Sequence, residues 1–224
     1  MKIKVLITGG SGLLAVNWAL SIRDNYAVTL LLHHKKISLL GVDTSVVSLG
    51  SLDECLSVLE KHQPDVVIHT AGLTTVEECE SNSNLAQEVN VDLAKNIAIA
   101  CNQQSVKLVH ISTDHLFSGN QEFSTEDSAT NPVNNYSKTK LLGEQEVLKN
   151  CKGALIIRTN FFCWGMKYRQ SFSDFILNKL RNNKQIDLFS DVFFTPILVS
   201  ELSKKVHQLI NENFSGRFNV VGGE

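Results

Sequence analysis

The chain opens with a strand, a glycine turn and a helix in direct succession, and this order limits the fold more than any other feature. Residues 2–7 form a short apolar run that becomes fully hydrophobic, as a buried parallel strand does. Gly9 and Gly12 interrupt the run, and a helix-like stretch follows over 13–22. This arrangement places backbone amides and a helix N-terminus where a pyrophosphate can bind.

The rest of the chain repeats the alternation of strand and helix. Apolar runs alternate with helical stretches, the runs at 27–32, 65–69, 107–111 and 154–157 and the stretches at 51–62, 84–101 and 136–148. Such alternation predicts an α/β fold, a Rossmann-type doubly wound parallel sheet whose ligand site lies at the carboxyl ends of the strands. Polar residues at 70–72, 112–114 and 158–160 follow strands, so we expect them to converge at that edge.

Composition excludes several classes of function. With 224 residues, 43% of them hydrophobic, the chain can bury a full core. A formal net charge of −2 gives no reason to expect a nucleic acid or an anionic membrane. Five cysteines without a Cys-x-x-Cys pair suit reduced thiols. Signal-peptide, membrane-spanning and metal-ligand patterns are missing, so we expect a cytoplasmic protein without a metal site.

Tyr136 and Lys140 stand four residues apart in a predicted helix, so they share one face. A lysine ammonium beside a phenol lowers the pKa of the phenol, which then gives up its proton closer to neutral pH. A general acid for a carbonyl oxygen needs this property. The same spacing also occurs in ordinary amphipathic helices. Its position behind the glycine turn and behind Thr113 favours nicotinamide-dependent carbonyl chemistry.

The second predicted strand ends in two histidines followed by two lysines, from His33 to Lys36. An acid near this point usually binds the ribose hydroxyls of NAD, whereas a cation accommodates the 2′-phosphate of NADP. No acid occurs between Asp24 and Asp43. The pattern therefore predicts NADP as the preferred cofactor over NAD, with His33 beside it. A basic surface loop is the alternative.

An ordered series of motifs covers nearly the whole chain: TGGSGLLA at 8–15, HTAG at 69–72, STDHLFSG at 112–119, NPVNNYSKTKLLGE at 131–144, RTNFFCWG at 158–165 and DVFFTP at 191–196. With these motifs the chain resembles the extended short-chain dehydrogenase/reductases, and most closely the dTDP-4-dehydrorhamnose reductase group of sugar-nucleotide reductases. The resemblance implies that Thr113 holds a substrate carbonyl, that Tyr136 protonates its oxygen, and that Lys140 binds the nicotinamide ribose and lowers the pKa of Tyr136. It also implies a set of cofactor-binding residues: Gly9, Ser11, Gly12, Leu13, His33, Leu49, Ala71 and Gly72.

Two departures from the family pattern concern the substrate. His115 stands where the reductases usually carry Tyr and the related dehydratases carry a Glu base, and the missing Glu argues against dehydration. Asn160 and Phe161 replace the usual Ser-Trp. We expect all three residues at the sugar, although a packing role for His115 is the alternative.

The expected organisation is an NAD(P)-binding Rossmann domain over 1–160 and a substrate-binding lobe over 161–224. Relative to the family we expect this lobe to be incomplete, and we expect 198–211 to pack back on the main domain. Apolar residues within 170–182 recur at helical spacing and predict a helix face that belongs to the core: Phe172, Phe175, Ile176 and Leu180.

Together these features predict an NAD(P)H-dependent reductase of a keto group on a nucleotide-linked sugar of the dTDP-4-keto-6-deoxy type, in the synthesis of deoxysugars or cell-surface polysaccharide. Two alternatives stay open. One is a nucleotide-sugar 4-epimerase that retains its NAD, and the other is a non-catalytic NADP-binding regulatory subunit of the same fold. A nucleotide sugar is the expected partner, and whether the chain forms a homodimer stays open.

Overall fold

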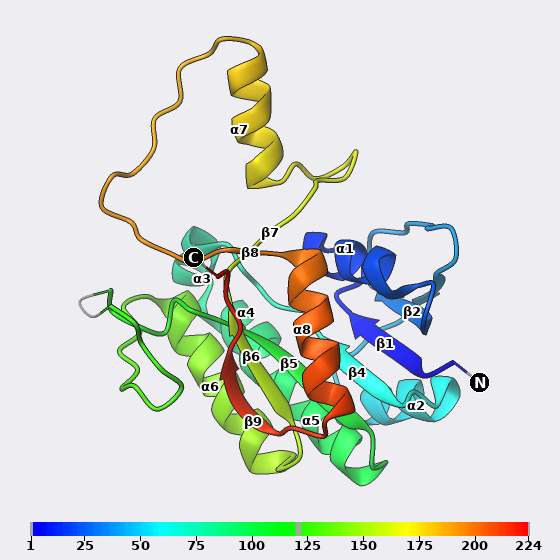
Figure 1. Ribbon diagram of the computed structural model, residues 1–224. Helices are drawn as coiled ribbons and strands as arrows, with labels where there is room; N and C mark the ends of the chain where they lie inside the picture. The colour runs from blue at the N-terminus through cyan, green and yellow to red at the C-terminus, as the bar shows by residue number, and fades with distance from the viewer. Residues whose placement is uncertain (1, 120–121, 224) are drawn as a thin grey trace.

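The computed structural model describes residues 2–119 and 122–223. The described residues form a seven-stranded parallel sheet flanked by helices (Figure 1), which confirms the predicted fold class. In sheet order the strands are β3 (Asp43–Val46), β2 (Ala27–Leu32), β1 (Lys4–Thr8), β4 (Val66–His69), β5 (Lys107–Thr113), β6 (Leu155–Thr159) and β9 (Gly216–Asn219). The strand order reverses between β1 and β4, and open α/β sheets bind ligands at such a switch point.

Helices cover both faces of the sheet. One face carries α1 (Leu13–Ile22) and α8 (Val199–Asn211), and the other carries α2 (Leu52–His62), α5 (Leu93–Gln103) and α6 (Asn135–Asn150). Neighbouring residues of β1 point into opposite cores, Ile7 toward Trp18 of α1 and Leu6 toward α2 and α5. This alternation has the period of two that a strand imposes, so a strand that is apolar throughout can serve both cores.

The helical stretch predicted over 84–101 is not one regular helix. Beyond α3 (Val76–Ser81), the chain forms α4 (Ser83–Gln87), a π-helical turn η1 (Glu88–Asp92) and then α5. Asn90 in this turn is buried, and its side-chain amide exchanges two hydrogen bonds with the backbone of Leu73 at 2.8 and 3.0 Å. It also donates to Thr139 Oγ1 of α6 at 3.1 Å. The wider turn therefore accompanies a buried amide that joins three segments.

Beyond β6 the chain leaves the sheet at β7 (Phe161–Phe162) and returns at β8 (Ile197–Leu198), which pairs with β7. The excursion between them contains α7 (Phe172–Arg181), which extends away from the sheet and its helices in Figure 1. The predicted helix is present, but the prediction that its apolar face belongs to the core is wrong. Each of the ten residues of α7 is described, and none is buried. Phe172 is 58% exposed and Leu180 is 60% exposed, because the excursion carries them away from both cores.

Candidate active site

The turn between β1 and α1 requires glycine at two positions. Gly9 has a φ of +64°, a left-handed conformation, and a Cβ there would lie 2.9 Å from the backbone of Ala71. Gly10 donates its N–H to Leu31 O at 2.8 Å, and a Cβ on Gly10 would lie 2.8 Å from the same oxygen. The turn is therefore pressed against the ends of β2 and β4. The predicted set of cofactor residues leaves out Gly10, although the consecutive glycines after the strand were a signal.

The N-terminus of α1 fits a bound phosphate group. Gly12 is the N-cap and offers no side chain to the first N–H groups of the helix, and the first turn contains no acidic residue. Such N–H groups need an acceptor, and the helix dipole favours an anion there. With the close-packed glycines beside it, the N-terminus of α1 suits a dinucleotide pyrophosphate, and its contact with Ser11, Gly12 and Leu13 stays a prediction.

Thr8 joins the glycine turn to the end of β4. Its Oγ1 accepts hydrogen bonds from the backbone N–H groups of Thr70 and Ala71, both at 3.2 Å. We infer that the hydroxyl proton goes to Nδ1 of His69 at 2.8 Å, which makes His69 the Nε2–H tautomer. Burial lowers the pKa of His69 to about 3, so the ring is neutral. The predicted cofactor residues Ala71 and Gly72 thereby lie directly beside the turn.

The other predicted cofactor residues lie at the same edge of the sheet. His33 follows β2 directly and is exposed, with its ring 3.6 Å from the ring of His34. Leu49 lies beyond β3, half-buried against the second core, and its carbonyl accepts from Cys55 Sγ at 3.7 Å. Both residues are available along the carboxyl ends of β2 and β3, and their contact with a cofactor stays a prediction.

The predicted catalytic and substrate residues meet where β5 and β6 end. Thr113 is the last residue of β5 rather than the first residue after it, and its hydroxyl lies close enough to Tyr136, in the first turn of α6, to lower the pKa of that phenol. The ring of His115 lies edge-on to Tyr136 with centroids 6.0 Å apart. Asn160 Nδ2 donates to Asp114 Oδ1 at 3.5 Å, which brings the end of β6 to the same place.

Burial raises the pKa of Tyr136 above its usual value, and the neighbouring hydroxyl of Thr113 opposes that rise only in part. Desolvation of the phenolate is the largest effect on this pKa, and Lys140 is not among its causes, so the lowering of the Tyr136 pKa by Lys140 stays a prediction. The consequence is a phenol that keeps its proton at neutral pH.

Lys140 follows Tyr136 by one helical turn of α6. Its side chain is 6% exposed, and Nζ donates to Ile111 O at 2.7 Å. Burial lowers the pKa of Lys140 to about 8, while the charge of Glu144 acts in the opposite direction. Lys140 therefore remains mostly charged at neutral pH, although it lies inside the protein.

Two neutral histidines lie near Lys140 on the same face of the sheet. His69 of β4 and His110 of β5 are register partners, and their rings stack with centroids 5.3 Å apart. Burial and the charge of Lys140 both lower the pKa of His110 well below its usual value. The interior beneath the site is thus polar without adding a second positive charge. Sequence reasoning missed the pair because each histidine sits within an apolar run.

A buried ion pair anchors the helix that carries Tyr136 and Lys140. Glu144 of α6 is fully buried and accepts from Arg158 of β6, from Nε at 3.0 Å and from Nη2 at 2.8 Å. Arg217 Nε of β9 lies 3.6 Å from the same carboxylate. Three elements therefore share one charge network. The sequence contained both partners, but no local spacing pairs residue 144 with residue 158.

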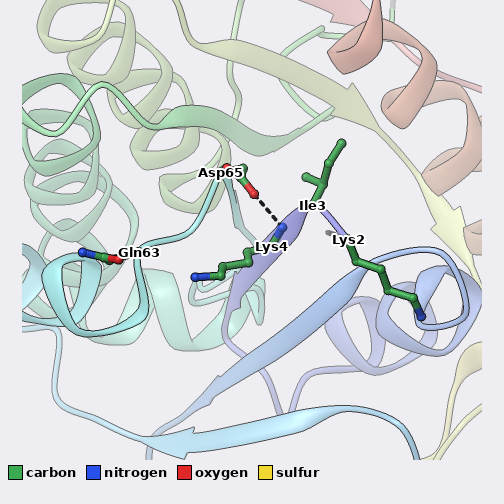
Figure 2. Close-up of a pocket in the computed structure, with 5 residues that line it drawn as sticks. All are labelled: Lys2, Ile3, Lys4, Gln63 and Asp65. Atoms are coloured by element: carbon green, nitrogen blue, oxygen red, sulfur yellow. Dashed lines mark hydrogen bonds between the residues drawn. The ribbon is translucent and has the colours of Figure 1, made fainter.

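One hollow lies at the opposite edge of the sheet. It measures about 400 Å³ and is lined by residues at the amino ends of β1 and β4, as Figure 2 shows: Lys2, Ile3, Lys4, Gln63 and Asp65. Asp65 Oδ2 accepts from the N–H of Lys4 at 2.7 Å. Because its carboxylate is already engaged and the ligand edge of such sheets is the other one, we place the site at the carboxyl ends.

Across 2–119 and 122–223, no cluster of three or more His, Cys, Asp or Glu side chains could hold a metal ion. In the same part of the chain, no helix has the length and apolar character that crossing a membrane requires.

Comparison with known proteins agrees with this geometry. The family model described as "RmlD substrate binding domain" matches residues 2–222. The chain belongs to this family. Among the relatives, "Probable low-salt glycan biosynthesis reductase Agl14" of Haloferax volcanii is 26% identical over 96% of this chain and 73% of its own length. The dTDP-4-dehydrorhamnose reductase of Salmonella typhimurium is 30% identical over 74% of this chain, and the match spans 56% of that relative.

A solved structure shares the fold over the whole length of this chain. The dTDP-4-dehydrorhamnose reductase from Bacillus anthracis, crystallised in complex with NADP, superposes with a TM-score of 0.86 at 25% identity. The superposition covers 100% of this chain and 76% of that structure. The likeness therefore includes the sheet and the excursion that contains α7.

Proposed function

We propose that the chain is an NADPH-dependent reductase of a keto group on a nucleotide-linked sugar, of the dTDP-4-keto-6-deoxy type. The observation that carries the proposal is the convergence of Thr113 at the end of β5 with Tyr136 and the buried Lys140 of α6, at the sheet edge that also holds the glycine turn. The names of the relatives support the reductase class, and the NADP in the Bacillus anthracis structure supports the cofactor.

The side chains supply what carbonyl reduction demands. A bound nicotinamide would provide the hydride. Thr113 and Tyr136 can both donate hydrogen bonds to the carbonyl oxygen, where negative charge develops. The raised pKa of Tyr136 keeps its proton available for transfer to that oxygen. The buried cation Lys140, one helical turn further along α6, can stabilise the phenolate that remains.

His115 and Asn160 are the proposed sugar contacts. His115 is exposed and packs edge-on to Tyr136, while Asn160 is half-buried and bonded to Asp114. Both lie within reach of a substrate whose carbonyl is held by Thr113. Because these two residues differ from the usual family residues, we expect them, rather than the family name, to indicate which sugar the protein accepts.

The test is oxidation of NADPH on addition of dTDP-4-keto-6-deoxy sugars, compared between wild type and Tyr136→Phe. We expect the rate to fall at least about 100-fold, because the phenol proton is lost, while NADPH binding persists. Lys138→Met, at an exposed position of the same helix, is the control and should keep the wild-type rate.

Other results would redirect the proposal. NAD that survives purification, with no net oxidation of NADPH, would indicate the 4-epimerase. Binding of NADPH with no turnover of any such sugar would indicate a regulatory subunit.

A further inference from the structure

The segment between β7 and α7 returns to the glycine turn. Tyr168 in this segment donates its hydroxyl to Ser11 O at 2.9 Å. The ammonium of Lys35, which follows β2, lies over the Tyr168 ring at 4.6 Å from its centroid. Tyr168 therefore contacts both halves of the expected cofactor edge, the glycine turn and the basic residues after β2.

A cation after β2 is the usual partner of the 2′-phosphate of NADP in folds of this kind. We propose that Tyr168 forms a clasp with Lys35 that strengthens the selection of a 2′-phosphorylated dinucleotide. In this clasp Lys35 pairs with the phosphate, and Tyr168 is a positioning residue that holds Lys35 beside the turn. The inference rests on the dinucleotide binding contained in the proposed function, but it does not depend on the sugar or on turnover.

The charge around Lys35 agrees with this role. No acid occurs from 25 to 42 to compete for its ammonium or to bind a ribose 2′-hydroxyl. A cation stacked on an aromatic face is held in place but keeps its N–H donors available to another partner. A lysine that is already ordered loses less freedom when the phosphate binds, so the contact strengthens affinity.

Tyr168 is itself held by the segment around it. Asn17 Nδ2 of α1 donates to Trp164 O at 2.9 Å. Met166 and Arg169 exchange backbone hydrogen bonds at 2.8 and 2.9 Å, which closes a tight turn around Tyr168. The Tyr168 ring is thus placed by α1 and by its own turn rather than by the exposed face of α7.

The experiment is titration of the purified chain with NADPH and, separately, with NADH, followed by fluorescence and without sugar. We expect Lys35→Met to weaken NADPH binding about tenfold or more, as loss of a charged contact does. Binding of NADH should change less than about twofold. Tyr168→Leu should weaken NADPH binding by about 2- to 5-fold, the size of an exposed cation–π contact, again with little change for NADH.

Two further variants make the result specific. Lys36→Met removes the neighbouring exposed lysine and should leave the ratio of the two affinities near the wild-type value. Tyr168→Phe keeps the ring under Lys35 and loses only the hydrogen bond to Ser11. Its ratio of NADPH affinity to NADH affinity should therefore stay closer to the wild-type ratio than that of Tyr168→Leu.

Three outcomes would overturn the clasp: equal losses for Lys35→Met and Lys36→Met, an unchanged affinity ratio in Tyr168→Leu, or a wild type that does not prefer NADPH. A clasp that passes these tests in a chain that reduces no sugar nucleotide would leave this inference standing and remove the proposed function. Reduction of a sugar nucleotide by a chain whose variants fail these binding tests would remove the clasp and leave the proposed function standing.

Discussion

Helices α7 and α8 have similar apolar patterns and opposite surroundings. In α8, Val199, Leu202 and Val206 are buried against α1 and the sheet. In α7, Phe172 and Leu180 lie on an apolar face that remains exposed. The comparison teaches that helical periodicity identifies the apolar face of a helix, whereas the path of the chain decides whether anything covers it.

The two helices also depend on different interactions. Ser171 and Asp174 form a capping box at the N-terminus of α7, and two basic residues complement its last turn. By contrast, the N-cap of α8 makes no side-chain hydrogen bond, so burial of its apolar face is its main support. Local interactions therefore maintain α7, while tertiary packing maintains α8.

The largest difference in stability should appear when a buried arginine of the sheet and an exposed arginine of α7 are each replaced. Arg158→Met leaves the fully buried Glu144 without its bidentate partner, which should lower the free energy of unfolding by about 3–5 kcal/mol. Arg181→Met, at an exposed position in the last turn of α7, should change it by less than about 0.5 kcal/mol. Urea unfolding measures both, and equal effects would refute the contrast.

A smaller effect is expected when one leucine is truncated in each helix. Leu202→Ala in α8 removes a fully buried side chain and should cost about 3 kcal/mol. Leu180→Ala in α7 removes a side chain that is 60% exposed and should cost less than about 0.5 kcal/mol. A large cost for Leu180→Ala would mean that the face of α7 is covered in solution.

The smallest of these effects is a loss of stability in acid that comes from the buried His207 of α8. His207 accepts from Trp18 Nε1 at 3.2 Å, and burial lowers its pKa from 6.5 to about 4. Below pH 6.5 the unfolded chain binds a proton that the folded chain does not, so stability falls as pH drops toward 4. His207 should account for about 2 kcal/mol of the loss by pH 5.

Unfolding of His207→Gln at pH 7 and pH 5 tests this expectation, because the amide oxygen can still accept from Trp18 while the titration disappears. Its acid dependence should be shallower than that of the wild type. His34→Gln, at an exposed position, should keep the wild-type slope. If His207→Gln also keeps the wild-type dependence of stability on pH, the buried neutral histidine is not responsible for the loss of stability in acid.

Prediction from sequence succeeded where the signal was local. The glycine turn and the face shared by Tyr136 and Lys140 depend on residues no more than four positions apart. The ion pair of Glu144 with Arg158 joins distant segments, so no such spacing could reveal it. The π-helical turn at Asn90 was missed for the same reason, because its amide bonds to Leu73 and Thr139 from other segments.

The sequence by itself determined the alternation of strand and helix, the glycine turn and the spacing of Tyr136 and Lys140 on one helix, since these follow from short-range sterics and periodicity. Only the tertiary structure decided the direction of the pKa shift of Tyr136, because burial is a property of the whole fold. It likewise decided that α7 is exposed and that Tyr168 reaches Ser11. Contacts between distant segments depend on the path of the chain in space, and a local pattern does not contain that path.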